Sequence, residues 1–384
     1  MAKLEIATNI KGSFDADPTE KSMRNRVTDI LRNKFEAYGY LPVETSMINY
    51  LSLLTYKYDP EAEIVREIYK IRDQGDRDLG LRFDLTVPFC KYIAMNQQLR
   101  MPFKRYEIGK VWRNGPVKLG RAREFYQCDV DVVGLGGAHI EAELIIMAVE
   151  AYKEMGLDVV IKYNNRKLLP YSDAVIACID RMAKISREEL VKDLSAHMTK
   201  PEAETLVDNL KNTPKCDELI ELEKCLADLG VLDSCEYTPY LARGLNVYTG
   251  TVFEVFARNS KMTSSLGGGG RYDKIIGNFV ENGKEYPAVG ISFGLEPIMA
   301  VIMEQQASKA QPLIDAMLVP LGTESWCQGY ANTLRKQGQK VLVYLGGKAI
   351  GKAIEYGASY GIKRVAIIGE DEVNGKAIVW KEVS

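Results

Sequence analysis

The sequence is poor in the residues that mark metal sites, disulfide frameworks and membrane spans. Its 384 residues include only two histidines, His139 and His197, and the seven cysteines are scattered without a Cys-x-x-Cys pair. A histidine-based triad, a zinc site and a disulfide framework are therefore not indicated, and we expect no metal ligand from the protein. No run of 18 apolar residues and no basic-then-apolar leader occurs, which predicts a cytoplasmic protein without a membrane partner.

An excess of charge of one sign is also missing. The sequence has 50 Lys and Arg and 52 Asp and Glu, which gives a net charge of −2. Overall basicity therefore does not indicate a nucleic-acid partner. A nucleic acid would then have to bind to local basic patches on the protein. The hydrophobic share of 46% and the charged share of 27% are ordinary for globular proteins. The length allows two or three domains.

The most informative stretch runs from residue 103 to residue 133. Residues 103–112 read as a strand, residues 114–120 hold two glycines and a proline and so form a loop, and residues 123–133 read as a second, antiparallel strand. Alternate strand residues share a face. The even positions of the second strand are mostly apolar and belong on a core. The odd positions carry Arg123, Gln127, Asp129 and Asp131, so this face either meets solvent or lines a binding site.

Two binding chemistries meet in this stretch. Arg113, Arg121 and Arg123 suit a phosphate-bearing ligand, because a guanidinium on a strand end can bind phosphate bidentately. Gln127 and Asp131 lie at strand spacing, which suits a small polar ligand bound beside the phosphates. A polyphosphate held beside a small zwitterion suggests activation of a carboxylate by a nucleotide.

The strand–loop–strand resembles motif 2 of class II aminoacyl-tRNA synthetases, and in detail that of the histidyl-tRNA synthetase family. The resemblance implies that Arg113 contacts the ATP α-phosphate, with Arg121 and Arg123 also on the ATP side. It implies that Gln127 and Asp131 line the pocket for the histidine side chain.

Three further blocks carry the same resemblance. Residues 241–254 are similar to the peptide that distinguishes the family; its Arg243 is implied to contact the α-phosphate and the substrate carboxylate, and its Tyr248 to lie at the imidazole. Residues 266–274 hold a glycine run without a following Gly-Lys-Ser/Thr, so this is not a Walker-type phosphate loop. The resemblance makes it a strand under the amino acid. Tyr272 is implied to face the pocket. The third block, residues 81–88, is similar to the family segment that holds the α-ammonium, which implies that role for Asp84 and Thr86. The resemblance also implies a contact of Glu296 with ATP.

The predicted fold is an α+β class II synthetase catalytic core built on an antiparallel sheet, from residues 1–164 and 236–307. Residues 165–235 read as charged helices without strand alternation, a helical insertion. Strand–helix alternation over residues 312–384 predicts an α/β domain with a largely parallel sheet, which resembles the family's anticodon-binding domain. The resemblance also implies a homodimer.

The implied activity is ATP-dependent activation of L-histidine, with Mg²⁺ neutralising the outer phosphates, and transfer to tRNA(His). Departures from the motifs keep an alternative open. Gly115 stands where motif 2 usually has an acid, Pro297 where motif 3 usually has an arginine, and Asn246 and Val247 replace the more usual Asp and Tyr. Lys118 and Arg121 are candidates to compensate. The alternative is a histidine-binding paralogue that charges no tRNA, such as the regulatory subunit of ATP phosphoribosyltransferase.

Overall fold

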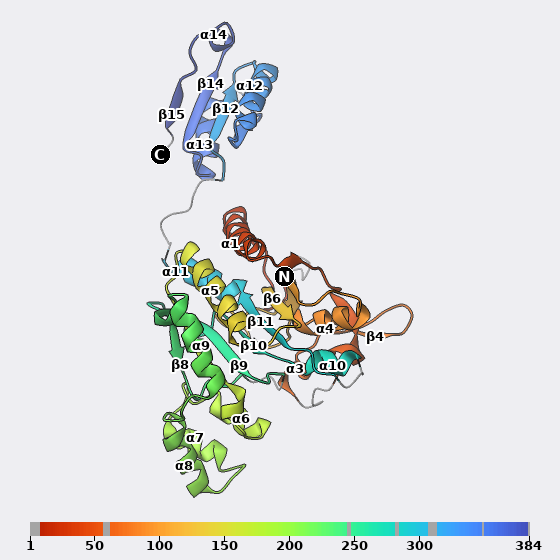
Figure 1. Cartoon of the computed structure of the whole chain (residues 1–384). Helices are drawn as coiled ribbons and strands as arrows, with labels where there is room; N and C mark the ends of the chain where they lie inside the picture. Colours follow the sequence, from red (N-terminus) through yellow and green to blue (C-terminus); the bar gives the residue numbers. More distant parts are fainter. Residues whose placement is uncertain are drawn as a thin grey trace, which may run out of the picture. The chain divides into compact units, whose positions relative to one another are not determined.

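The larger part of the molecule is built on a sheet that contains two long neighbouring strands, residues 103–112 and 124–133. In the computed structural model (Figure 1), residues 8–56, 62–243, 247–280, 284–305, 313–347 and 349–382 are described. The chain divides into two compact units, Met1–Asp15 with Arg24–Gln305 and Ala16–Met23 with Gln306–Ser384.

The larger unit contains an eight-stranded sheet. Pairing is antiparallel throughout the middle of this sheet and parallel only in the edge pairs β1–β5 and β7–β8. The predicted α+β core on an antiparallel sheet is thus confirmed. In spatial order the strands are β1 (Leu41–Pro42), β5 (Phe103–Trp112), β6 (Glu124–Val133), β11 (Ala288–Gly294), β10 (Gly267–Arg271), β9 (Thr251–Ala257), β7 (Val159–Asn165) and β8 (Cys235–Tyr237).

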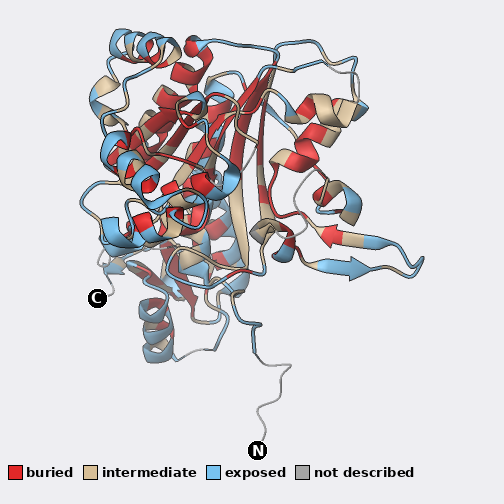
Figure 2. Cartoon of the chain, turned by 90° about the horizontal axis from the view of Figure 1, so that it is seen from below, coloured by how far each residue is buried: buried red, intermediate tan, exposed pale blue. Residues whose placement is uncertain are grey.

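The apolar face of β6 lies against helices. Cys128, Val130 and Val132 are fully buried, and α5 (Ala138–Glu154) and α11 (Leu295–Gln305) contact the strands of the sheet. Helix α1 (Pro18–Ala37) adds Leu31 and Phe35 to the buried core and ends before Gly39, whose φ of 78° is left-handed. Figure 2 shows the sheet buried along most of its length and the outer helix faces exposed.

Smaller elements surround this sheet. A three-stranded sheet is formed, in spatial order, by β2 (Ile48–Tyr50), β4 (Asp78–Leu81) and β3 (Lys70–Arg72). Two helices, α4 (Thr86–Met95) and α10 (Ile275–Val280), pack against each other. Two single-turn helices, α2 (Leu51–Leu54) and α3 (Glu63–Arg66), precede β3.

The segment between β7 and β8 is helical in its described elements. Leu190, Leu194 and Leu210 belong to one apolar cluster of this segment, which explains why the helices hold together despite charged outer faces. The elements are the 3₁₀ turns Arg166–Leu168 and Leu232–Ser234 and the helices α6 (Asp173–Ile179), α7 (Arg187–Leu194), α8 (Lys200–Leu210) and α9 (Asp217–Asp228).

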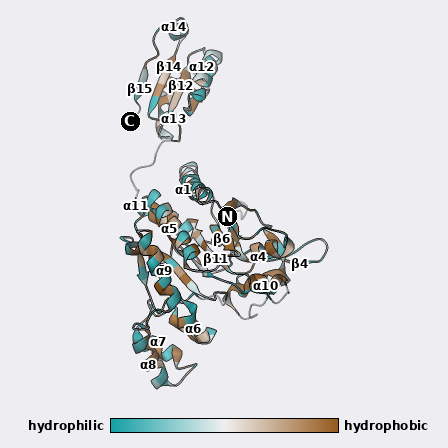
Figure 3. Ribbon diagram, in the orientation of Figure 1, coloured by the Kyte–Doolittle hydropathy of each residue, from teal (hydrophilic) through white to brown (hydrophobic). Residues whose placement is uncertain are grey.

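The smaller unit is an α/β fold. Its sheet has the order β13 (Val341–Val343), β12 (Ala316–Pro320), β14 (Arg364–Ile368) and β15 (Trp380–Glu382), with only β15 antiparallel. Helices α12 (Glu324–Lys336), α13 (Ile350–Ser359) and the short α14 (Glu370–Val373) complete it. Strands β12 and β14 lie toward the hydrophobic end of the scale (Figure 3). The largely parallel sheet predicted from the alternation is confirmed. No described helix combines the length and apolarity needed to cross a membrane.

Candidate active site

Two rows of residues across neighbouring strands form the floor of a pocket in the larger unit. Asp131 of β6 pairs with Gly290 of β11, which pairs with Gly270 of β10; Asp129 likewise pairs with Ser292, and Ser292 with Gly268. The glycines leave room above the sheet. A Cβ on Gly290 would lie 2.8 Å from Cγ of Asp131. Asp129 and Asp131 on the polar face of β6 therefore line a pocket and are buried from bulk solvent.

The pocket contains five of the six residues predicted to bind histidine. Asp84 and Thr86 contribute from the start of α4, Asp131 from β6, Tyr248 from the segment before β9 and Tyr272 from the end of β10. These residues are distant in sequence, and the sheet brings them together. The sixth, Gln127, does not line the pocket directly; its Nε2 donates to Oγ of Ser292 at 2.9 Å.

Carboxylates dominate this pocket. Asp84, Asp129 and Asp131 are 8%, 3% and 3% exposed. Oδ1 of Asp131 accepts a hydrogen bond from the Tyr272 hydroxyl, and Oδ2 forms an ion pair with Nη2 of Arg105 at 2.6 Å. Among the described residues, none donates a hydrogen bond to Oδ1 of Asp129. A buried acceptor of this kind calls for a donor, so the pocket suits a ligand that carries N–H groups and positive charge.

Burial changes the ionisation of these acids. It raises the pKa of Asp129 to about 7, with Arg105 opposing and Asp131 adding to the shift. It raises the pKa of Asp84 to about 6, against the Val87 N–H hydrogen bond and the charges of Arg113 and Arg105. Desolvation disfavours the charged form of a carboxyl group, whereas a bound cation favours it.

Arg243 lies over the glycine strand. A Cβ on Gly268 would lie 3.2 Å from Cζ of Arg243, so the missing side chain makes room for the guanidinium. Nη1 of Arg243 donates to the Phe253 carbonyl at 3.3 Å, and Nε lies 4.0 Å from Oε1 of Glu254. The guanidinium also lies 5.4 Å from the Tyr248 ring centroid, which connects it to the wall of the pocket.

Arg113 approaches the pocket from the end of β5. Its Nε donates to the Phe83 carbonyl at 2.9 Å, next to Asp84 in the chain. Burial lowers the pKa of Arg113, and Asp84, Glu67 and Asp129 oppose that shift by attraction. Asp129 also attracts Arg243. Both arginines predicted to be catalytic thus lie beside residues that line the pocket, Arg113 next to Asp84 and Arg243 over Gly268.

The remaining residues predicted at ATP have structural partners. Nη2 of Arg121 lies 3.2 Å from Oε1 of Glu67, and Nε of Arg123 donates to the Gly115 carbonyl at 3.1 Å. Glu296 is 7% exposed. Its Oε1 pairs with Nη1 of Arg24 at 2.8 Å, and its Oε2 accepts the Tyr126 N–H at 3.1 Å. The Glu296 carboxylate therefore ties α11 to α1 and β6, and its predicted contact with ATP remains a prediction. Asn246 lies outside the described residues.

Sequence reasoning missed the ionic network behind the acids. On β5, Arg105 pairs in register with Asp131 and Glu107 with Asp129, and both side chains are buried. Nη1 of Arg82 lies 2.7 Å from Oε1 of Glu107. The alternation rule used for β6 also places Arg105 and Glu107 on one face of β5. This alternation is the sequence signal that indicates the two residues. Ser292 had no comparable signal.

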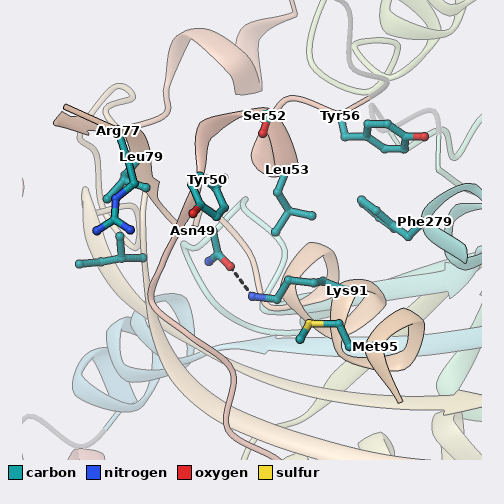
Figure 4. Close-up of a pocket in the computed structure, with 11 residues that line it drawn as sticks. Asn49, Tyr50, Ser52, Leu53, Tyr56, Arg77, Leu79, Lys91, Met95 and Phe279 are labelled. Carbon is teal, nitrogen blue, oxygen red and sulfur yellow. Dashed lines mark hydrogen bonds between the residues drawn. The ribbon is translucent and has the colours of Figure 1, made fainter. Parts of the chain in front are cut away.

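A separate groove of about 700 Å³ lies between the three-stranded sheet and α4 (Figure 4). Leu53, Met95 and Phe279 line it, and Nζ of Lys91 donates to Oδ1 of Asn49 at 2.6 Å. None of the predicted site residues lines this groove. Its walls are mainly apolar, unlike the acidic pocket over the sheet.

The fold is that of the catalytic core of class II aminoacyl-tRNA synthetases, with a C-terminal α/β unit. The family model described as histidyl-tRNA synthetase matches residues 12–171 and 172–298. Histidine–tRNA ligase 1 of Bacillus cereus (strain ATCC 14579) is 41% identical over 98% of this chain and 95% of its own length. The crystal structure of histidyl-tRNA synthetase from Nostoc sp. PCC 7120 is 26% identical, with a TM-score of 0.82 over 98% of this chain and 94% of that one. The chain belongs to the histidyl-tRNA synthetase family.

The fold is shared more widely. A structure from Bacillus halodurans C, described as an ATP phosphoribosyltransferase regulatory subunit/histidyl-tRNA synthetase, has a TM-score of 0.77 at 17% identity and covers 96% of this chain and 99% of that chain. The sequence identity to histidine–tRNA ligases favours the synthetase over the non-charging paralogue.

Proposed function

We propose that this chain activates L-histidine with ATP and transfers the histidyl group to tRNA(His). The observation that carries the residue assignments is the acidic pocket over the glycine strand, with Arg243 lying over Gly268 and Arg113 hydrogen-bonded to the Phe83 carbonyl next to Asp84. Asp84 and Thr86 receive the ammonium of histidine, and Asp131, Tyr248 and Tyr272 surround its imidazole, with Gln127 behind Ser292. The domain boundaries given for the core, the helical insertion and the anticodon-binding domain belong to the same proposal.

In the first step a carboxylate oxygen of histidine attacks the α-phosphorus of ATP. A P–O bond forms, the bond to the β-phosphate oxygen breaks, and pyrophosphate leaves. Negative charge grows on the α-phosphoryl oxygens, where Arg113 and Arg243 stabilise it. The chain needs no side-chain nucleophile, because positioning and charge stabilisation supply the catalysis.

In the second step a hydroxyl at the tRNA 3′ end attacks the carbonyl carbon of the adenylate, and AMP leaves. Mg²⁺ prefers oxygen ligands and binds together with the ATP phosphates. We assign no residue of this chain to Mg²⁺. We place the reaction in the cytoplasm.

Incorporation of labelled histidine into a tRNA(His) transcript tests this function. Histidine binding without incorporation would favour the non-charging paralogue.

The pocket acids predict a pH dependence for histidine binding. The ammonium needs ionised carboxylates, and in the empty pocket Asp129 and Asp84 protonate as the pH falls through about 7 and about 6. Histidine affinity is therefore expected to be full near pH 8 and to fall below pH 7, by up to about tenfold per pH unit for each group. Calorimetry from pH 5.5 to 8.5 measures it.

The control for this pH series is Asp129→Asn. This variant should bind histidine more weakly at pH 8 and lose most of the pH dependence between pH 6 and 8. The histidine ligand's own imidazole titrates equally in both proteins, so the difference isolates Asp129. Parallel pH profiles for wild type and variant would contradict the assignment.

We also propose a homodimer. The residues around the groove of Figure 4 include exposed apolar side chains, Ile48 at 49%, Tyr50 at 56% and Met95 at 74%. Contiguous exposed apolar side chains commonly mark protein interfaces. Analytical ultracentrifugation of the native protein tests this; a monomeric mass at micromolar concentration would contradict it.

A further inference from the structure

The loop between β5 and β6 is held at its base by a residue from a distant segment. Glu67, directly after α3, is 6% exposed. Its backbone carbonyl accepts the Asn114 N–H at 2.8 Å, and its Oε1 lies 3.2 Å from Nη2 of Arg121. Its carboxylate also attracts Arg113. Glu67 thus pairs with Arg121 and fixes the backbone directly after Arg113.

The same carboxylate occupies the space that a side chain at position 115 would fill. A Cβ on Gly115 would collide with Oε1 of Glu67, would lie 2.8 Å from its Cδ, and would lie 3.2 Å from Nη2 of Arg121. Position 115 is one of the two departures from the family motifs in the nucleotide half of the site. The acid missing there in the sequence is supplied in space by residue 67.

The second departure lies against the tip of the same loop. Gly120 has a left-handed φ of 71°, and a Cβ there would lie 3.2 Å from Cα and 3.3 Å from Cβ of Pro297. The loop therefore rests closely on the proline, next to Arg121. Of the two departures in the nucleotide half of the site, Gly115 thus lies within this loop and Pro297 lies against it.

We propose that Glu67 is a positioning residue for the nucleotide, replacing the absent acid at position 115 and holding Arg121 beside Arg113. Arg121 has a 40% exposed side chain, so without its carboxylate partner it would lose a defined orientation. An arginine held in a defined orientation can bind phosphate oxygens bidentately. This inference rests on the proposed function, because it assigns the phosphates of ATP to these arginines.

The test is a double-mutant cycle on Glu67 and Gly115. In Glu67→Ala we expect the KM and the Kd for MgATP to rise about tenfold, as for the loss of one charge-assisted contact, and the KM for histidine to stay within about twofold. Gly115→Ala should do the same, because its methyl group displaces the carboxylate. In the double variant the carboxylate is absent, so the added methyl group displaces nothing. The KM and the Kd of the double variant for MgATP should therefore match those of Glu67→Ala. Glu67→Gln, which keeps the side-chain shape, should give a smaller effect.

Several outcomes would overturn the inference. One is that the rises in the Kd for MgATP caused by Glu67→Ala and Gly115→Ala multiply in the double variant. Another is an unchanged Kd for MgATP in Glu67→Ala. A third is a rise in the KM for histidine as large as that for MgATP, which would indicate a merely structural role. Gly329→Ala, in α12 with open space around its Cα, is the matched glycine control and should leave both substrates unaffected. Calorimetric Kd values need no turnover. Wild-type protein that binds MgATP without histidine-dependent exchange would therefore refute the proposed function and still test Glu67.

Discussion

Arg243→Ala is expected to lower kcat for histidine-dependent ATP–pyrophosphate exchange by about 10²–10³-fold, the loss typical for one group that stabilises charge in the transition state. Its guanidinium lies over Gly268 beside the pocket, and its other protein contacts are weak, a 3.3 Å hydrogen bond to Phe253 and a 4.0 Å approach to Glu254. The melting temperature should therefore change by only a few degrees.

Two further variants make the Arg243 result specific. Arg243→Lys keeps the charge but loses the planar fork, so an intermediate activity is expected. Arg187→Ala removes an exposed ion pair to Asp208 in the helical segment and should leave exchange unchanged. Activity of Arg243→Ala within threefold of wild type, in a folded protein, would remove this arginine from the catalytic assignment.

Asp131→Asn is expected to damage both stability and histidine binding. Its ion pair with Arg105 measures 2.6 Å, and Arg105 is fully buried, with Glu107 at 3.5 Å as its other carboxylate partner. Removing one member of a buried pair costs about 3–5 kcal/mol, so we expect a lower melting temperature. The KM for histidine should rise about 100-fold while the KM for ATP stays within about threefold.

The control is Asp158→Asn, which breaks an exposed pair with Arg258 at 3.6 Å and should change neither stability nor activity measurably. Thermal unfolding with and without histidine separates the two effects, since histidine should stabilise the wild type more than the Asp131 variant. An unchanged KM for histidine in Asp131→Asn would mean that the pocket binds something other than the imidazole of histidine.

Local patterns were sufficient to predict the elements that carry the site. The alternation along residues 123–133 predicted both faces of β6, and the glycine and proline content of residues 114–120 predicted the loop, because strand period and turn chemistry are local properties. The same alternation on β5 would have found Arg105 and Glu107.

Contacts between distant segments could not be predicted in this way. Nothing near Gly115 in the sequence indicates that Glu67 occupies the adjacent space. Glu296, predicted at ATP by its place in motif 3, has its carboxylate engaged by Arg24 and the Tyr126 N–H. The register that places Asp131 beside Gly290 depends on pairing between strands about 160 residues apart. Such pairings are set by the whole fold and not by local propensity.

The most direct test of the central claim is histidine-dependent ATP–pyrophosphate exchange by the wild-type protein, measured against the other amino acids. The acidic pocket between Arg113 and Arg243 predicts exchange with histidine and discrimination of at least about 10⁴-fold against amino acids that leave its buried acceptors unpaired. Absence of exchange, with histidine still bound in the pocket, would contradict the account.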